Sequence, residues 1–478
     1  MSVKISKMKV DLFKKLLEAR PAYTVVKNQY SQNVEIFKFY NEDQCNVNEY
    51  RVLDEKDYNR FLSKRAMKRE PALTRQITSL SYKVGKQMLS LAEGMPNEAI
   101  FPFSRLELTT KSGDNMVLEE KDLAPALQYV PSQGLPSLLT ELRQFQQELH
   151  RPPPVPVSRD VLVTNGAQHG IYQCVDMLMD VGDPLLTTQY AYTGIHSALK
   201  PYQPEVIGIP EDENGLIPET LESVLNERLT RGLKMPRMMY LIPTGNNPTG
   251  TVITEERRRL IYEMACKYDF LIIEDDPYMF LNYNEAVPSF LSMDICGRVI
   301  RLDSLSKVIS SGLRAGWMTA PTPLLYRAEL HAQAEILHSC TLAQAIMLRL
   351  LANRSALSSH LRATRSFYEL RRSALSVALR RVEGLAEWVE PTAGLFHWVR
   401  VNGIEDTYNM VFHTAFERGL MLVPGHAFLY DTNAPCRYVR LTFSKINMDD
   451  METAVRHLAD VIRQEQKLKT KKRLATEV

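Results

Sequence analysis

The segment Phe270-Leu-Ile-Ile-Glu-Asp-Asp-Pro-Tyr278 opens with four apolar residues and continues with three acidic ones. A run this short and this apolar is typical of a strand that is buried on both faces of a sheet. A segment with helical periodicity precedes it, from Thr254 to Tyr268, and a second apolar run, Arg298-Val-Ile-Arg-Leu302, follows it. The alternation of buried strands with crossover helices predicts an α/β fold built on a parallel or mixed sheet.

The same alternation extends over residues 157–320. The run Asp160-Val-Leu-Val163 precedes a helical segment from Gln168 to Met179, and the run Met238-Met-Tyr-Leu-Ile242 precedes the helix that begins near Thr254. Parallel strands need a crossover between them, and that crossover is usually a helix. We therefore predict that these runs are successive strands of one sheet.

The chain changes character after about residue 325. Two long helical stretches lead to Gly394-Leu-Phe-His-Trp-Val-Arg400 and Arg437-Tyr-Val-Arg-Leu-Thr-Phe443, which predict strands of a second, smaller domain. Five segments are expected: an N-terminal extension of unread role at 1–55, a segment at 56–105 that contributes to the active site and the small domain, a large domain at 106–330, a C-terminal small domain at 331–466 and a basic tail at 467–478.

Composition and charge exclude several classes of protein. The 478 residues include 58 Lys plus Arg and 56 Asp plus Glu, a formal net charge of +2, and 45% of them are hydrophobic. A net charge near zero argues against broad capture of nucleic acid. No apolar stretch approaches the roughly 18 residues that span a bilayer. We therefore predict a soluble protein with small-molecule substrates and without nucleic-acid or membrane partners.

The cysteines bear on compartment and on metal binding. The six cysteines are scattered without a C-x-x-C pair, and H-E-x-x-H is absent, so neither a disulfide framework nor a metal site is predicted. Reduced thiols favour the cytoplasm. A mitochondrial location is the alternative, because Val10, Phe13 and Leu17 form a helical stripe flanked by lysines, although Asp11 and Glu18 within it count against a presequence.

Polar side chains gather after the predicted strands, and ligands of open α/β sheets bind beyond the carboxyl ends of the strands. The set comprises Thr164-Asn-Gly-Ala-Gln168, Asn247, Asp275, Tyr278, Ser304, Ser306, Lys307 and Arg314. It combines a helix-opening turn, an amide, a carboxylate, a phenol, hydroxyls, a lysine and an arginine. These are the groups that pyridoxal phosphate requires.

The phosphate of that cofactor needs a helix N-terminus, hydroxyls and an arginine. Residues 166–168, Ser304, Ser306 and Arg314 can supply them. Each of these residues alone has an ordinary explanation as a turn, a cap or a surface ion pair. Their joint occurrence at the ends of successive strands is what favours a cofactor site.

The ring of the cofactor makes three further demands. Its pyridine nitrogen stays protonated beside a buried carboxylate, for which Asp275 is the candidate. Its phenolic oxygen accepts hydrogen bonds, which Asn247 and Tyr278 can donate. Its aldehyde needs an amine, and Lys307 is the amine of this set.

Several motifs carry a family resemblance: Ser90-Leu-Ala-Glu-Gly-Met-Pro-Asn97, Leu127-Gln-Tyr129, Asn247-Pro-Thr-Gly250, Asp275-Asp-Pro-Tyr278, Ser304-Leu-Ser-Lys307 and Ser310-Ser-Gly-Leu-Arg314. They resemble those of the fold-type I pyridoxal-phosphate aminotransferases, and more narrowly the kynurenine/α-aminoadipate branch that fungal aromatic aminotransferases share. The resemblance covers roughly residues 58–465. It implies a large domain with a mostly parallel sheet of the seven-stranded type between helices, and a smaller α+β domain.

The resemblance also implies roles toward the cofactor. Lys307 matches the lysine that forms the Schiff base and moves the proton, and Asp275 matches the carboxylate on the pyridine nitrogen. Tyr192 matches the ring stacked on the cofactor and completes the implied catalytic set. The other implied cofactor ligands are Gly166, Ala167, Gln168, Asn247, Tyr278, Ser304, Ser306, Arg314 and Tyr129 of the partner subunit.

Toward the substrate, the resemblance implies that Arg440 holds the α-carboxylate and that Asn247 assists it. Gly94 and Arg75 match positions beside the substrate in the N-terminal segment. The position of Tyr129 implies a homodimer with shared active sites.

This sequence departs from the family pattern at three places. Ala167 stands where a serine is usual, so one phosphate hydroxyl is absent. Gln189 and Tyr190 replace an acidic residue and a proline, and Glu93 replaces a glycine near the substrate entrance. These departures bear on cofactor affinity and substrate choice, and none of them falls on Lys307.

The expected activity is a ping-pong transamination from an amino acid to a 2-oxo acid, with 2-oxoglutarate as the expected acceptor. Amino acids of the 2-aminoadipate, kynurenine and aromatic types all stay open as donors. The alternatives are lyase or decarboxylase chemistry on the same fold, and a regulatory protein with an aminotransferase-like domain. The N-terminal extension lacks a helix-turn-helix pattern, which counts against the regulator.

Overall fold

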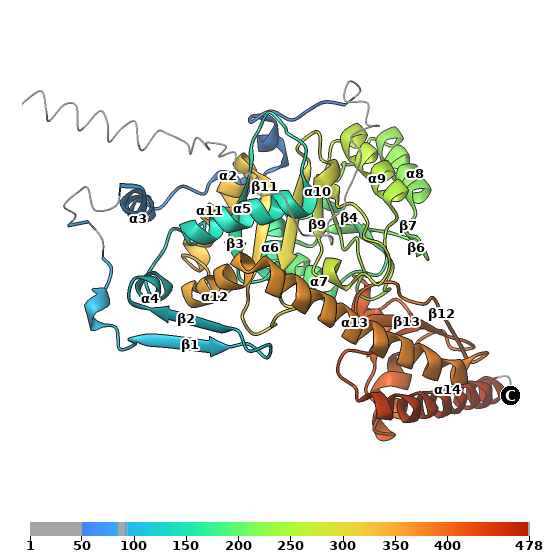
Figure 1. Ribbon diagram of the computed structural model, residues 1–478. Coiled ribbons are helices and arrows are strands. Elements are labelled where there is room, and N and C mark those ends of the chain that lie inside the picture. The colour runs from blue at the N-terminus through green and yellow to red at the C-terminus, as the bar shows by residue number, and fades with distance from the viewer. Residues whose placement is uncertain (1–49, 85–90, 93, 477–478) are drawn as a thin grey trace, which may run out of the picture.

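A central sheet positions the residues described above. The structure is a computed structural model that describes residues 50–84, 91–92 and 94–476, and within them one sheet has the strand order β3-β11-β10-β9-β8-β4-β5 (Figure 1). Its strands are β3 (Arg159–Thr164), β4 (Pro184–Thr188), β5 (Glu205–Ile209), β8 (Met238–Leu241), β9 (Leu271–Asp275), β10 (Val299–Ser304) and β11 (Gly316–Pro321). Only β11 runs antiparallel to its neighbours, β10 and β3. The predicted mostly parallel α/β sheet is therefore confirmed.

The strands are buried because helices cover both faces of the sheet. Successive side chains of β9 enter two different hydrophobic clusters: Leu271 and Ile273 pack with α6 and α7, whereas Ile272 packs with α8, α9 and α10. This explains why the run shows no alternation of polar and apolar residues. The helices of this body are α5 (Pro136–His150), α6 (Ala167–Leu178), α7 (Thr193–Leu199), α8 (Pro218–Thr230), α9 (Glu255–Tyr268), α10 (Phe290–Met293), α11 (Thr322–Glu335) and α12 (Thr341–Ala352).

Local signals explain the bounds of α9. The Thr254 hydroxyl accepts a hydrogen bond from the Arg257 backbone N–H at 3.4 Å, and Glu255 and Glu256 lie in the first turn, where the helix dipole favours negative charge. The helix ends at Asp269, which adopts a left-handed conformation with φ 59°. The short turn after it leads directly into β9.

A second, smaller sheet has the antiparallel order β12-β13-β15-β14 (Figure 1). Its strands are β12 (Ala386–Trp388), β13 (Phe396–Val401), β14 (Val423–Pro424) and β15 (Tyr438–Thr442), and it is accompanied by α13 (Arg354–Leu379) and α14 (Met448–Thr476). Strands β13 and β15 confirm the two predicted strands. The division at residue 330 stays a proposal, because α12 still packs against α5 of the larger body.

The N-terminal part wraps the larger body. The buried Tyr58 hydroxyl donates to the Gly297 carbonyl at 2.8 Å, so residues from 50 onward belong to the fold. The elements here are η1 (Asp57–Phe61), α2 (Lys64–Met67), α3 (Leu73–Val84), η3 (Glu98–Ile100), β1 (Arg105–Thr109), β2 (Asn115–Glu119) and α4 (Glu120–Leu127). The helical stripe near Val10 lies outside the described residues. Among the described residues, no helix combines the length and apolarity needed to cross a membrane.

The remaining elements are short. They are η4 (Lys200–Tyr202), β6 (Glu211–Asp212), β7 (Gly215–Leu216), η5 (Met279–Leu281), η6 (Arg380–Val382), η7 (Met410–Ala415) and η8 (Gly425–Phe428). Two of them matter for the site. Glu211 of β6 accepts a hydrogen bond from Asn246 in the loop after β8, and Phe428 of η8 lies beside Arg440 of β15.

Candidate active site

The predicted residues meet at the carboxyl edge of the central sheet. Five strand ends contribute, from β3, β4, β8, β9 and β10, and the loop between β10 and β11 adds an arginine. In chain order they place Gly166, Ala167 and Gln168, then Tyr192, then Asn247, then Asp275 and Tyr278, then Ser304, Ser306, Lys307 and Arg314. Strand β15 of the smaller sheet adds Arg440 to this edge, because its side chain contacts Asn247.

Asp275 is the last residue of β9 and is almost fully buried. Its Oδ2 atom accepts a hydrogen bond from the Tyr240 hydroxyl at 2.7 Å, whereas its Oδ1 atom is buried without a hydrogen-bond partner among the described residues. Burial is the main cause that raises the pKa of Asp275 to about 7, and the nearby Asp303 adds to the effect. A buried acceptor without a donor is a place where a cationic N–H of a ligand would be stabilised.

Lys307 lies on the loop after β10, partly buried, and its Nζ atom is 5.9 Å from the centroid of the Tyr278 ring. Burial lowers the pKa of Lys307, and the positive charges of Arg440 and Arg314 lower it further, against the opposing effect of Asp275. A lowered pKa increases the fraction of neutral amine, which is the nucleophilic form.

A glycine turn lies between β3 and α6. Gly166 has φ 80°, and a Cβ atom at this position would lie 2.7 Å from Nη2 of Arg314, so only glycine allows the arginine to approach. Arg314 Nη2 donates to the Asn165 carbonyl at 2.9 Å, and Nη1 lies 3.4 Å from the Ser306 hydroxyl. The Ser304 hydroxyl donates to that of Ser306 at 2.9 Å. The guanidinium, both hydroxyls and the turn therefore face one small region.

Tyr192, on the loop after β4, lies beside Gln168 in the first turn of α6. The Gln168 amide donates to the Gly194 carbonyl at 3.1 Å. A Cβ atom at Gly194 would lie 2.1 Å from Gln168 Oε1 and 2.2 Å from the Tyr192 ring, so a side chain there would displace both residues. Ala167 begins α6 and offers only a backbone N–H at this place.

Arg440 links the two sheets. Its Nη1 atom donates to Asn247 Oδ1 at 2.8 Å, which fixes the orientation of the amide because arginine can only donate. Its guanidinium lies 4.2 Å from the Phe396 ring centroid and 5.0 Å from that of Phe428. Burial lowers the pKa of Arg440, and its Nε atom has no partner among the described residues. Arg440 is therefore oriented and partly desolvated, which would strengthen its hydrogen bonds to an anion bound here.

Three predicted residues are not joined to this group by any contact among the described residues of one chain. Arg75 is buried, donates to the Ser132 hydroxyl at 3.1 Å and contacts the Val130 carbonyl, so its head group is already bound. Gly94 is exposed and has open space around it. Tyr129 is 43% exposed, with its ring 5.7 Å from that of His338. Their roles stay predictions, as does that of Glu93, which lies outside the described residues.

The sequence reasoning missed several supporting side chains. Tyr240 was included only as part of an apolar run, and nothing in the pattern indicated that its hydroxyl reaches Asp275. Tyr190, noted only as a departure, packs its ring 5.1 Å from Trp398 and 5.4 Å from Tyr438, both in the smaller sheet. An aromatic residue after a buried strand is the one signal that could have suggested such an inter-sheet contact.

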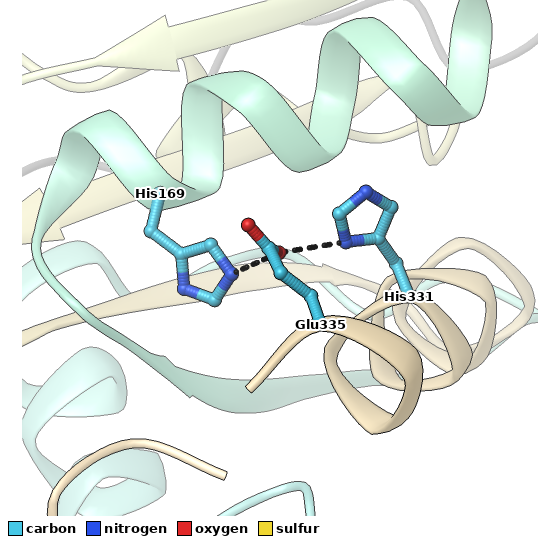
Figure 2. A group of neighbouring side chains, drawn as sticks. All are labelled: His169, His331 and Glu335. Carbon is cyan, nitrogen blue, oxygen red and sulfur yellow. Dashed lines mark hydrogen bonds and ion pairs between the residues drawn. The ribbon is translucent and has the colours of Figure 1, made fainter. Parts of the chain in front are cut away.

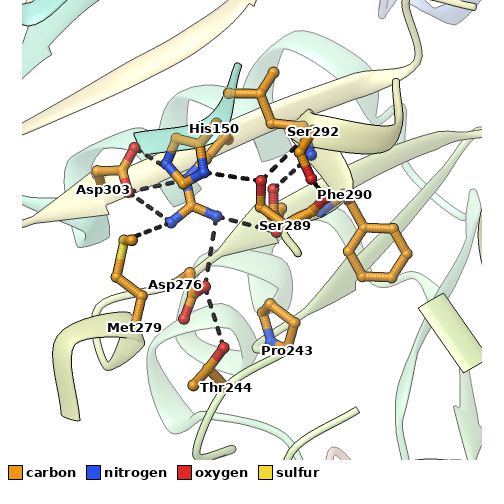
Figure 3. A network of polar contacts seen from close by, with 12 residues as sticks. His150, Pro243, Thr244, Asp276, Met279, Ser289, Phe290, Ser292 and Asp303 are labelled. Atoms are coloured by element: carbon orange, nitrogen blue, oxygen red, sulfur yellow. Dashed lines mark hydrogen bonds and ion pairs between the residues drawn. The ribbon is translucent and has the colours of Figure 1, made fainter. Parts of the chain in front are cut away.

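A buried charge network holds the ends of β9 and β10 together (Figure 3). The Arg301 guanidinium lies 3.0 Å from Glu274, 3.4 Å from Asp276 and 2.8 Å from Asp303. Glu274 also accepts the backbone N–H of Phe290 at 2.8 Å, which attaches α10. Breaking one member of such a group leaves an uncompensated buried charge. The network therefore fixes the strand that carries Asp275 from the opposite face.

Glu211 on β6 holds the loop that carries Asn247. Its carboxylate accepts from the Asn246 amide at 3.0 Å and from the hydroxyls of Thr251 at 2.9 Å and Thr249 at 3.4 Å. None of these donors is charged. Burial is accordingly the main cause that raises the pKa of Glu211 to about 7.

Glu211→Gln should change how stability depends on pH. Because the folded pKa lies above the ordinary 4.5, the folded state binds more protons between these values, so the free energy of unfolding falls as pH rises through this window. A neutral glutamine removes that loss, and we expect the variant to be about 1–2 kcal/mol more stable than the wild type near pH 8 but equal to it near pH 4. Urea unfolding at both pH values measures this. Glu213→Gln, which changes an exposed carboxylate in the same turn, is the control. If the free energy of unfolding changed with pH in Glu211→Gln as it does in the wild type, the raised pKa of Glu211 would be contradicted.

Comparison with known proteins identifies the family of this fold. The family model for aminotransferases of class I and II matches residues 91–458. A mitochondrial kynurenine/alpha-aminoadipate aminotransferase from Mus musculus is 41% identical over 422 residues, which cover 85% of this chain and 99% of that protein. An aromatic amino acid aminotransferase from Dictyostelium discoideum is 32% identical over 457 residues, covering 92% of this chain and 94% of that protein.

Solved structures agree with this result. The crystal structure of the aminotransferase Aro8 from Candida albicans superposes with a TM-score of 0.77 at 26% identity, covering 87% of this chain and 100% of that one. The Pyrococcus horikoshii kynurenine aminotransferase, solved in complex with PMP, has a TM-score of 0.69 at 29% identity and covers 86% of this chain and 98% of that one. The long family match and the high identity over nearly complete relatives confirm the resemblance drawn from the motifs. The chain is a member of the class I and II aminotransferase family.

Proposed function

We propose that this aminotransferase uses pyridoxal phosphate, bound at the carboxyl edge of the central sheet and linked to Lys307. The observation that carries the proposal is the buried Oδ1 atom of Asp275, which lacks a donor at the same sheet edge where a lysine with a lowered pKa stands. A protonated pyridine nitrogen is the donor that this oxygen lacks. Once bound, the cofactor supplies the electron sink for the reaction.

The donor set fits the phosphate of this cofactor. The turn at Gly166 presents the N-terminus of α6, and Arg314, Ser304 and Ser306 add a cation and two hydroxyls around the same region. Arg314 adopts φ 50°, a strained backbone for a residue with a side chain, and such strain is kept where the surrounding structure needs the side chain in one place. Ala167 supplies its backbone N–H but no hydroxyl, so we expect one phosphate contact fewer than in relatives with serine.

The residues of the chain divide the remaining work. Arg440 holds the substrate carboxylate with two parallel N–H groups, and Asn247, oriented by Arg440, can donate through Nδ2 to an oxygen of the bound ring. The Tyr278 hydroxyl could donate to the same oxygen. Lys307, as a neutral amine, would take the proton from the substrate Cα atom and deliver it to the bound cofactor. Family membership favours this transamination over the lyase, decarboxylase and regulatory alternatives.

For the substrate, we propose an amino acid with an aromatic or long side chain, of the kynurenine, 2-aminoadipate or aromatic type, with 2-oxoglutarate as acceptor. The rings of Phe396 and Phe428 beside Arg440 give this part of the site an apolar wall. The names of the relatives from Mus musculus and Dictyostelium discoideum support the same range.

A panel assay tests the proposed function. The purified holoenzyme is incubated with one amino acid at a time and 2-oxoglutarate, and the glutamate that forms is measured. We expect glutamate with at least one of kynurenine, 2-aminoadipate, phenylalanine or tyrosine, and none when the amino donor is left out. Oxo-acid-independent loss of carbon dioxide or ammonia without glutamate would indicate the lyase or decarboxylase chemistry instead.

We further propose a homodimer in which Tyr129 reaches the phosphate site of the partner. Support comes from Tyr129 itself, which is exposed, and from the exposed apolar side chains of the N-terminal part at Leu73, Ile100 and Phe103. Sedimentation should give twice the mass of one chain for the active species, and Tyr129→Phe should weaken cofactor binding without dissociating the dimer. A fully active monomer would contradict this proposal.

The compartment is a separate matter. The cytoplasmic prediction depends on the scattered cysteines, whereas the mitochondrial alternative depends on the stripe at Val10, Phe13 and Leu17, which lies outside the described residues. The Mus musculus relative is named as mitochondrial. Both locations stay predictions, and cell fractionation distinguishes them.

A further inference from the structure

Two histidines and a glutamate converge at a place the proposed reaction does not use (Figure 2). His169 lies in the first turn of α6, while His331 and Glu335 lie four residues apart in the last turns of α11 and so share one face of that helix. Their ligand atoms all lie within 4.8 Å of one another. Figure 2 shows the Glu335 carboxylate between the two imidazole rings.

His331 has a carboxylate at each ring nitrogen. Its Nε2 atom is 3.6 Å from Asp176 Oδ2 and its Nδ1 atom is 3.1 Å from Glu335 Oε2, while its side chain is only 5% exposed. A neutral imidazole carries one proton and can therefore face only one of these carboxylates with an N–H. The Nδ1 atom has no hydrogen-bond partner among the described residues. Nδ1 of His331 and Oε2 of Glu335 therefore lie close to each other without a cation between them.

The surroundings match those of a metal-bound histidine. A ligating histidine usually directs its second nitrogen at a carboxylate, which orients the ring and strengthens the ligand. Asp176 occupies that position, and it is held in turn by Arg69 at 2.8 Å and by the Tyr202 hydroxyl at 3.0 Å. Two imidazoles and one carboxylate are a common ligand set for zinc, with a further position left for water. The partly exposed Glu335 leaves the cluster open to solvent.

His169 connects this cluster to the phosphate turn. Its Nε2 atom lies 3.1 Å from Glu335 Oε2, and its Nδ1 atom accepts the Asn165 backbone N–H at 3.2 Å. A metal ion bonded to Nε2 requires that the single proton of the neutral ring be on Nδ1. The resulting Nδ1–H would point at the Asn165 backbone N–H, and two donors cannot form a hydrogen bond with each other. Metal binding therefore weakens the Asn165 contact, and the carbonyl of the same residue accepts the hydrogen bond from Arg314.

We propose that His169, His331 and Glu335 bind a zinc ion, and that this binding loosens the turn that we assign to the cofactor phosphate. The ion bonds to Nε2 of His169, Nδ1 of His331 and a carboxylate oxygen of Glu335, with water in the fourth position. The proton on His169 Nε2 moves to Nδ1 of the same ring. No oxidation state changes in this step. The site lies outside the proposed catalytic set, and only its coupling to the turn rests on the proposed function.

Calorimetric titration of the holoenzyme with zinc chloride tests the site. We expect about one ion per chain, and at least about tenfold weaker binding in Glu335→Gln and in His169→Gln, since loss of a ligand costs at least as much as loss of its supporting contact. His413→Gln, which removes an exposed histidine of η7, is the matched control and should bind zinc like the wild type. Absence of zinc binding, or equal binding in all variants, would overturn the site. The Glu335 side chain is 39% exposed, so we expect Glu335→Gln to fold like the wild type.

A second measurement tests the coupling. Cofactor release from the holoenzyme, followed by absorbance after rapid buffer exchange, should be several-fold faster with zinc than without it in the wild type. The rate should not respond to zinc in Glu335→Gln. Zinc binding without any change in release would overturn the coupling while leaving the site intact. If the chain held no pyridoxal phosphate at all, the proposed function would fail but the calorimetric result would still stand.

Discussion

Lys307→Ala should lower kcat for glutamate formation by about ten-thousand-fold or more, because it removes both the nucleophilic amine and the group that moves the proton. In the structure no other described lysine lies at this sheet edge with a pKa lowered by burial and by neighbouring arginines. Cofactor binding itself should persist, since Asp275 and Arg314 remain. The assay measures glutamate with the best amino donor from the panel, together with cofactor content.

The control for this variant is Lys200→Ala, which removes an exposed lysine at the end of α7. It should keep wild-type kinetics. Added primary amines of small size should restore part of the lost rate in Lys307→Ala, because the cavity left by the side chain can admit them. Near-normal activity of Lys307→Ala in a folded protein would remove this residue from the reaction.

Arg440→Lys should lower kcat/KM by roughly 30- to 1,000-fold for every amino-acid substrate, which corresponds to a loss of about 2–4 kcal/mol. Every substrate presents the α-carboxylate, and lysine cannot reproduce the two parallel N–H bonds of a guanidinium. The structure adds a second reason, because Arg440 also orients Asn247 through the bond at 2.8 Å. The substitution therefore changes two contacts at once.

Arg437→Lys is the matched control, since Arg437 is exposed just before β15 and should tolerate lysine. The absorbance of the bound cofactor should survive in Arg440→Lys, which separates loss of substrate binding from loss of cofactor. Wild-type kinetics with all amino acids in a folded, cofactor-loaded Arg440→Lys would show that another group binds the carboxylate.

Four strands of the central sheet, β3, β8, β9 and β10, could be predicted because each is a short apolar run buried on both faces, and such runs stand out in a sequence of average composition. Strand β9, with Leu271 and Ile273 on one face and Ile272 on the other, is the clearest case. Strands β4, β5 and β11 were not predicted; for β11, nothing in Gly316–Pro321 distinguishes an antiparallel partner of β3 from a loop. Direction and strand order depend on contacts between distant segments, which periodicity does not encode.

That the residues proposed for the cofactor lie at one sheet edge could be predicted for a related reason. They follow strand ends, and the carboxyl ends of parallel strands meet at one edge, so position along the chain becomes position in space. Side-chain contacts between different elements could not be predicted from the sequence. The Tyr240 bond to Asp275 depends on which face of β8 the ring occupies, and the cluster of His169 with Glu335 joins two helices far apart in sequence.

The measurement that tests the central claim most directly is the location of the cofactor link. The holoenzyme is reduced with borohydride, digested, and its peptides are sequenced by mass spectrometry. We expect one pyridoxyl group per chain, on the peptide that contains Ser304-Leu-Ser-Lys307, and none on that peptide in Lys307→Ala. A pyridoxyl group on any other lysine of the wild type, or the absence of one in a protein that still forms glutamate, would contradict the assignment of Lys307 and of the sheet edge around it.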